Sequence, residues 1–145
     1  MTGGFCTGRG DDLMSKDSIL IVDDNPDDIE ITKIVMAELG RKEKIEAASR
    51  GELALNSLRM GKDLPALILL DLKMPGMSGI DTLREIRADA RLHCIPVVIV
   101  TSSSLESDRE SAYATGADSF LHKSVDIDKF GKALDILLRR YLSPC

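Results

Sequence analysis

The stretch "PALILLDLKMPG", from Pro65 to Gly76, joins an aliphatic segment to an acid. Ala66 to Leu70 are all apolar, and a short run of this kind is typical of a strand buried on both faces. Asp71 follows directly, although an ionised carboxylate is costly to bury without partners. The stretch therefore predicts a buried strand that delivers Asp71 to a group of polar partners. We expect this carboxylate not to be deeply buried.

Short apolar segments alternate with helical patterns on both sides of this strand. The other expected strands cover residues 18–24, 44–48, 95–101 and 118–123, and the expected helices cover residues 25–40, 49–61, 78–90, 102–116 and 126–142. Five strand–helix units in succession predict an α/β fold with a parallel sheet and crossover helices.

The expected helix starts carry side chains that can cap a helix. Asn25 precedes the first helix and can accept hydrogen bonds from its free N–H groups. The pairs Ser49–Glu52 and Ser103–Glu106 have capping-box spacing, so we expect them to cap the second and fourth helices.

Length and composition favour one folded domain. The chain has 145 residues, of which 43% are hydrophobic and 30% charged, and this suits a single core with a polar surface. We expect a disordered Gly-rich tail over residues 1–17, a folded domain over residues 18–142 and a C-terminal tail over residues 143–145. No apolar run approaches the roughly 20 residues that span a bilayer, and the N-terminal stretch lacks the apolar region of a secretory signal. These features predict a cytoplasmic protein without a membrane partner.

Charge, aromatic content and cysteine usage weaken several function classes. The net charge is −5 with no dense Lys/Arg cluster, which argues against nucleic-acid binding. Aromatic residues make up 3% and Trp is absent, so stacking on a flavin or on bases is poorly supported. Cys6, Cys94 and Cys145 form no CxxC pair, and their odd number favours free thiols over a disulfide framework or a zinc site.

Polar residues end four of the expected strands. Asp23 and Asp24 end the first, Asp71 the third, Thr101 the fourth and Lys123 the fifth. In open parallel sheets, ligands bind beyond the carboxyl ends of the strands, so these groups should converge.

Three clustered carboxylates repel one another, and a hard divalent cation such as Mg²⁺ relieves that repulsion. One carboxylate could then act as a nucleophile toward a phosphoryl group, while the amine and the hydroxyl bind the phosphoryl oxygens.

In order along the chain, these motifs resemble the receiver domains of response regulators in two-component signalling. The matching motifs are the acidic pair Asp23–Asp24, "LLDLKMPGMSG", "VIVTSSS", the "GAD" at 116–118, and Lys123 after "SFLH". The resemblance covers roughly residues 18–142. It points to the stand-alone type related to chemotaxis regulators and to partners of phytochrome kinases. It implies a flavodoxin-like fold, which is a three-layer, doubly wound, five-stranded parallel sheet with strand order 2-1-3-4-5.

The resemblance also implies a role for each site residue. Asp71 would accept a phosphoryl group from a phosphohistidine. Asp24, Asp71 and the backbone carbonyl of Lys73 would ligate Mg²⁺ directly, and Asp23 would act largely through water. Lys123 would pair with the phosphoryl group.

A switch is implied as well. Thr101 would move to bond the arriving phosphoryl group, and the aromatic switch residue Phe120 would swing inward behind it. The surface of the fourth helix, fifth strand and fifth helix would then be remodelled, and this surface could support a homodimer.

Two positions depart from the usual pattern or vary within the family. Ser124 stands where the family usually has a proline after the lysine, often joined by a cis bond, so we expect a different or strained loop there. Lys73, two residues after the acceptor, lies where the family varies and tunes the lifetime of the phosphoryl group. We predict that Lys73→Ala changes the rate of autodephosphorylation, and an unchanged rate would contradict this.

The main hypothesis is a single-domain response regulator that is phosphorylated on Asp71. Its partners would be a histidine kinase or phosphotransfer protein and a downstream protein that the sequence does not identify. It would catalyse only its own phosphorylation and dephosphorylation and so would not be an enzyme in the usual sense. Its output would be phosphorylation-dependent protein binding or a phosphorelay.

Three alternatives stay open. An aspartate-nucleophile phosphohydrolase often carries a second acid two residues after the nucleophile, where this chain has Lys73. A phosphorylation-independent adaptor on the same scaffold has no physical need for the complete set of acids, threonine and lysine. A flavodoxin-like flavin carrier needs a phosphate-binding loop after the first strand, and the sequence has none.

Overall fold

The chain alternates strands and helices over residues 14–142, which are the residues that the computed structural model describes. The elements are β1 (Met14–Val22), α1 (Pro26–Glu38), β2 (Lys44–Ala48), α2 (Gly51–Met60), β3 (Leu64–Leu70), α3 (Gly79–Ala88), β4 (Val97–Thr101), α4 (Glu106–Thr115), β5 (Ser119–His122) and α5 (Ile127–Tyr141).

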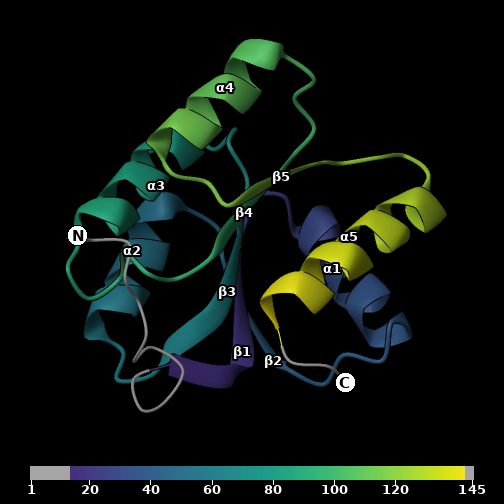
Figure 1. The fold of residues 1–145 in the computed structure, drawn as a ribbon, viewed down its shortest axis with the longest axis horizontal. Coiled ribbons are helices and arrows are strands. Elements are labelled where there is room, and N and C mark those ends of the chain that lie inside the picture. Colours follow the sequence, from purple (N-terminus) through teal and green to yellow (C-terminus); the bar gives the residue numbers. More distant parts are fainter. Residues whose placement is uncertain (1–13, 143–145) are drawn as a thin grey trace.

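The five strands form one parallel sheet in the order β2-β1-β3-β4-β5. Figure 1 shows α2, α3 and α4 on one side of this sheet and α1 and α5 on the other. The expected three-layer, doubly wound, flavodoxin-like fold is therefore confirmed.

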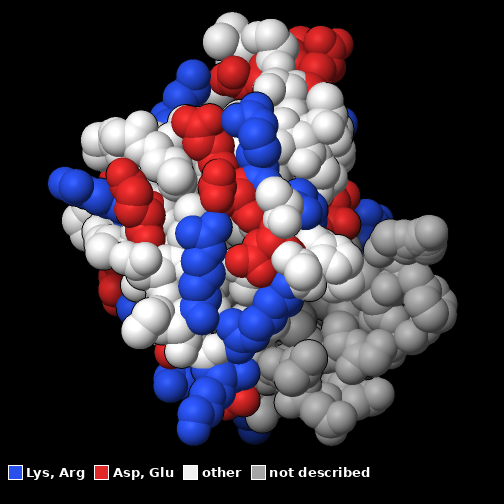
Figure 2. Space-filling view, turned by 90° about the vertical axis from the view of Figure 1, so that its left-hand side faces the viewer, with Lys and Arg blue, Asp and Glu red and all other residues white. Residues whose placement is uncertain are grey.

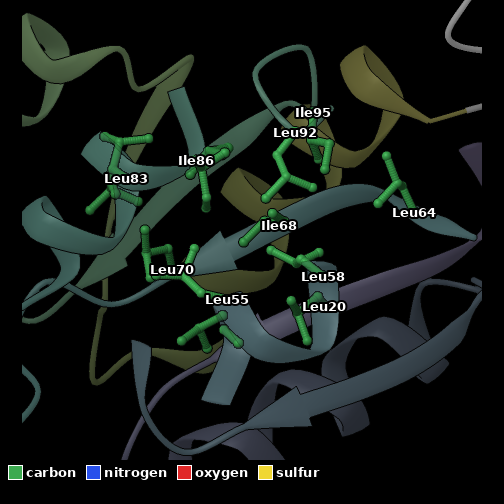
Figure 3. Packing of buried hydrophobic residues seen from close by; sticks show 14 of the residues in the cluster. Leu20, Leu55, Leu58, Leu64, Ile68, Leu70, Leu83, Ile86, Leu92 and Ile95 are labelled. Carbon is green, nitrogen blue, oxygen red and sulfur yellow. The ribbon is translucent and has the colours of Figure 1, made fainter. Parts of the chain in front are cut away.

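Each face of the sheet has its own hydrophobic core, because side chains alternate between the two faces along a strand. In β3, Ile68 and Leu70 belong to the cluster under α2 and α3, whereas Leu67 and Leu69 belong to the cluster under α1 and α5. Figure 3 shows the first cluster, which includes these labelled residues: Leu20, Leu55, Leu58, Leu64, Ile68, Leu70, Leu83, Ile86, Leu92 and Ile95. Since β3 is packed on both faces, the position of its carboxyl end is firmly fixed.

The first strand begins earlier than expected. The expected disordered tail included residues 14–17, but β1 starts at Met14 and pairs there with Leu64 of β3. The pairing is irregular between Ser15 and Ile19. The polar composition of this segment gives no sign of the backbone pairing that β3 offers. The rest of the expected N-terminal tail, residues 1–13, and the expected C-terminal tail, residues 143–145, lie outside the described residues.

One of the three expected helix caps is confirmed. The side chain of Asn25 accepts hydrogen bonds from the backbone N–H groups of residues 27 and 28. The two capping boxes are wrong. The N-cap of α2 is Arg50 rather than Ser49, with no side-chain cap bond. The N-cap of α4 is Leu105, again with no side-chain cap bond. The Ser103 hydroxyl donates to Asp108, and its oxygen accepts the backbone N–H of Leu105, which precedes the first residue of the helix.

The expectation of a free thiol is wrong for Cys94, which is disulfide-bonded. An odd cysteine count was weak evidence for a free thiol, because it does not exclude a single disulfide bond. The other two cysteines of the sequence lie outside the described residues.

Charges of both signs are mixed on the surface formed by α2 and α3. Figure 2 shows Lys and Arg side by side with Asp and Glu over the visible part of this face. Ion pairs link the two helices, since Arg59 of α2 lies 2.9 Å from Glu85 and 3.4 Å from Asp89. Among the helices of residues 14–142, none has the length and apolar character that a membrane crossing requires.

Candidate functional site

Three carboxylates meet at the carboxyl ends of β1 and β3. Asp23 and Asp24 directly follow β1, and Asp71 directly follows β3. The backbone N–H of Asp71 donates to the Val22 carbonyl over 2.9 Å, which keeps the two strand ends side by side. One oxygen of each carboxylate lies within 4.8 Å of the others. The predicted convergence of the three acids is therefore what the structure shows.

The three acids differ in burial. Asp23 and Asp71 are only 5% and 6% exposed, whereas Asp24 is exposed. The expectation that Asp71 is not deeply buried is therefore wrong. The reason is that the strand-end lysine, Lys123, lies against this carboxylate and provides the opposite charge that burial requires.

Lys123 binds the two buried acids. Its Nζ donates to Oδ2 of Asp23 over 2.8 Å and to Oδ2 of Asp71 over 3.2 Å. Its backbone N–H donates to the Thr101 carbonyl over 2.7 Å, so the end of β4 fixes where the lysine leaves β5. Three strand ends thus bring side chains into one polar cluster, whereas Thr101 is joined to it through its backbone carbonyl.

A further acid of this cluster was missed in the sequence. Asp28, in the first turn of α1, accepts a third hydrogen bond from Lys123 Nζ over 2.8 Å. From sequence it is only an acid near the positive end of a helix dipole. Spacing carries no signal for the contact, because Lys123 follows β5 and is 95 residues away along the chain.

The surroundings of Lys123 favour its charged form. Burial alone would lower the pKa of the Lys123 amine, but the hydrogen bonds to Asp23 and Asp28 outweigh it and raise this pKa above its ordinary value. For Asp23, burial raises the pKa of the carboxyl above its usual range, although the hydrogen bond from Lys123 acts in the opposite direction. Three carboxylates of the cluster thus share one cation.

The donor set fits a hard divalent cation. Mg²⁺ prefers oxygen ligands at about 2.0–2.1 Å, and three carboxylate oxygens within 4.8 Å of one another can approach one such ion with small side-chain rotations. A single ammonium leaves an excess of negative charge here. Asp23, Asp24 and Asp71 are therefore the residues that could hold the metal.

Polar contacts connect the loop after Asp71 to helix α4. The backbone N–H of Lys73 donates to Asp71 Oδ1 over 3.3 Å, while the Lys73 side chain lies 3.4 Å from Asp108 of α4. Asp108 also accepts the Ser103 hydroxyl. The backbone N–H of Ser103 donates to Oγ1 of the fully buried Thr101 over 3.3 Å. A displacement of Thr101 would therefore alter the hydrogen bonds that connect it, through Ser103, to the first turn of α4.

Phe120 lies in β5 and packs partly against the core under α2 and α3. The guanidinium of Arg109, from α4, lies over its ring at 5.8 Å from the centroid and over the Tyr113 ring at 5.6 Å. The ring thus lies between the core and the helix on its outer side.

The loop after Lys123 carries Ser124 in place of the proline that the family usually has. Residues 14–142 have no cis peptide bond, so the Lys123–Ser124 bond is trans. The Ser124 hydroxyl accepts the backbone N–H of Asp126 over 3.1 Å, and Asp126 in turn caps α5. Serine and aspartate side chains thus build the turn between β5 and α5.

Comparison with known proteins agrees with this geometry. The family model described as "Response regulator receiver domain" matches residues 19–135. The chain is 32% identical over 139 residues to the "Probable methanogenesis regulatory protein FilR2" of Methanothrix harundinacea, a match that covers 92% of this chain and 90% of that protein.

Two solved structures are similar over most of their length. One is the phosphorylated cyanobacterial phytochrome response regulator RcpA, with 28% identity, a TM-score of 0.81, and coverage of 89% of this chain and 96% of that chain. The other is the Mn²⁺-bound form of response regulator Rcp1, with 27% identity, a TM-score of 0.79 and the same coverage. The chain belongs to the response regulator receiver domain family.

Proposed function

We propose that this protein is a single-domain response regulator that accepts a phosphoryl group on Asp71 from a histidine kinase or a phosphotransfer protein. The observation that carries the proposal is the contact of Lys123 with Asp23 and Asp71, beside Asp24, at the converging strand ends. This arrangement has a nucleophilic carboxylate, a cation for phosphoryl oxygens and a carboxylate set for a metal in one place.

In this proposal Asp24, Asp71 and the backbone carbonyl of Lys73 bind Mg²⁺ directly, and Asp23 binds it largely through water. A bound Mg²⁺ supplies positive charge for the carboxylates and for the oxygens of the phosphoryl group. The similarity to a Mn²⁺-bound response regulator supports a divalent cation here.

The proposed transfer forms one bond and breaks one. A carboxylate oxygen of Asp71 attacks the phosphorus of the phosphohistidine, and a P–O bond forms as the P–N bond breaks. The electron pair stays with the imidazole, which leaves as a neutral ring when its other nitrogen carries a proton. Lys123 binds a phosphoryl oxygen, and Thr101 donates its hydroxyl to another. Hydrolysis of the resulting acyl phosphate returns Asp71 and releases inorganic phosphate.

The proposed output is a change of surface rather than turnover of a metabolite. When Thr101 moves toward the phosphoryl group, its contact with the Ser103 N–H is altered, and Phe120 gains room to turn inward. Both changes act on the surface of α4, β5 and α5. We infer that this surface binds a downstream protein or a second copy of the chain. A cytoplasmic location is part of the proposal, because ATP-dependent histidine kinases phosphorylate their partners there.

The test is phosphotransfer profiling against the histidine kinases and phosphotransfer proteins of the host, with Asp71→Asn as the control. The proposal expects rapid labelling of the wild type by one cognate donor in the presence of Mg²⁺ and no labelling of the variant. If no donor labels the wild type while the protein still binds partners, the phosphorylation-independent adaptor replaces this proposal.

A further inference from the structure

Asp28 contacts the strand-end lysine without belonging to the carboxylate set that could hold a metal. Its Oδ2 lies 2.8 Å from Lys123 Nζ, whereas the metal-competent set consists of Asp23, Asp24 and Asp71. The first turn of α1 fixes its backbone, since its N–H donates to Asn25 and its carbonyl accepts the Thr32 hydroxyl. The contact therefore needs a reason other than metal binding.

All hydrogen-bond donors of the lysine are in use. An ammonium has three N–H donors, and Lys123 directs them to Asp23, Asp28 and Asp71 over 2.8, 2.8 and 3.2 Å. A phosphoryl group bound to Asp71 presents new, strongly charged acceptors beside the same ammonium. To bond them fully, Lys123 has to weaken its contact with one of the other acids.

The burial of the two remaining partners decides which contact is given up. The side chain of Asp23 is 7% exposed, and that of Asp28 is 32% exposed. A buried carboxylate that loses its cation keeps its charge in a place that water does not reach, which is costly. Asp28 can be rehydrated at much lower cost, so it is the contact that Lys123 can release.

We propose that Asp28 is a positioning residue that competes with the phosphoryl group for Lys123 and so stabilises the unphosphorylated state. The inference rests on the proposed function, because it concerns the same lysine. Replacing this carboxylate by an amide removes the competing charge and leaves Lys123 free to bind the phosphoryl group.

The experiment measures how tightly the full chain binds beryllofluoride, a stable mimic of a phosphoryl group, at saturating Mg²⁺, by NMR titration. Asp28→Asn is expected to raise the affinity about three- to tenfold, the size of one charge-assisted contact at a partly exposed position. Asp27→Asn is the matched control. It removes the same charge from the same helix turn, but Asp27 is exposed, and its affinity should stay within about twofold of wild type.

Asp28→Glu separates competition from a structural effect, because it restores the charge near Lys123 and should return the affinity toward the wild-type value. Denaturant unfolding of all the variants shows that each is folded at the titration temperature. If Asp28→Asn binds beryllofluoride no better than Asp27→Asn, the competition is overturned. A wild type that binds no beryllofluoride at all overturns the proposed function itself, and the two failures are thus distinguishable.

Discussion

Replacing Gly79 by alanine tests how tightly helix α3 packs on the loop that carries Asp71. A Cβ at this position would lie 2.2 Å from the Asp71 carbonyl oxygen and 2.6 Å from the Leu72 Cα. Both neighbours are backbone atoms and cannot rotate away, so the loop or the helix has to shift by roughly 1 Å. Overpacking of this kind costs about 1–3 kcal/mol. Gly79 is the first residue of α3, so the preference of helix interiors for alanine offsets little of this cost. We therefore expect Gly79→Ala to lower the free energy of unfolding by that amount.

Gly131 in α5 is the matched control, because it is also a buried helical glycine. A Cβ there would lie 3.5 Å from Val35 Cγ1, which is an ordinary contact. Alanine is better than glycine inside a helix by about 0.8–1 kcal/mol, so Gly131→Ala should raise the free energy of unfolding. The assay is urea denaturation of wild type and both variants with a common slope.

The Gly79 variant should also bind Mg²⁺ more weakly, because the displaced carbonyl belongs to Asp71, which we propose as a ligand of the metal. The Gly131 variant should bind it like the wild type. The reasoning is refuted if Gly79→Ala lies within about 0.5 kcal/mol of wild type, or if the two variants change stability in the same direction.

Three further predictions follow from the site. Asp24→Asn should weaken Mg²⁺ binding by at least about tenfold in calorimetry, and an unchanged affinity would remove this acid from the metal site. Arg109→Ala removes a cation–π contact with Phe120 of about 0.5–1 kcal/mol. The conformer in which the Phe120 ring turns inward should therefore become roughly two- to fivefold more populated. Aromatic NMR spectra identical to those of wild type would show that Arg109 does not hold the ring. The hydrogen bond from Ser103 lowers the pKa of the Asp108 carboxyl, so its contribution to stability is present at neutral pH and is lost as the pH falls below about 4. In denaturant titrations, acidification should therefore lower the free energy of unfolding more for wild type than for Asp108→Asn. Equal decreases in the two proteins would contradict a lowered pKa of Asp108.

The order of strands and helices could be predicted because each element is marked by a pattern in its own short stretch of sequence. The aliphatic segments of β1, β3 and β4 and the polar residues between them are read directly from the chain. The convergence of Asp23, Asp71 and Lys123 was also predictable, because parallel strands bring their carboxyl ends to one edge of the sheet.

Contacts that depend on competing partners could not be predicted. Ser103 has capping-box spacing, but α4 begins only at Glu106. The Ser103 hydroxyl therefore donates to Asp108 and accepts the N–H of Leu105, which precedes the helix. The contact of Asp28 with Lys123 depends on how far the long lysine side chain extends from the end of β5 toward α1. The depth at which Asp71 is buried depends on the same lysine, which supplies the charge that makes burial tolerable.

The account depends most directly on Asp71 being the residue that carries the phosphoryl group. Sodium borohydride reduces an aspartyl phosphate to homoserine, and peptide mass spectrometry assigns the position of that change. After incubation with Mg²⁺ and a cognate phosphodonor, we predict homoserine at position 71 in the wild type and none in samples without donor. Homoserine at another acid, or none anywhere despite labelling of the protein, would contradict the account.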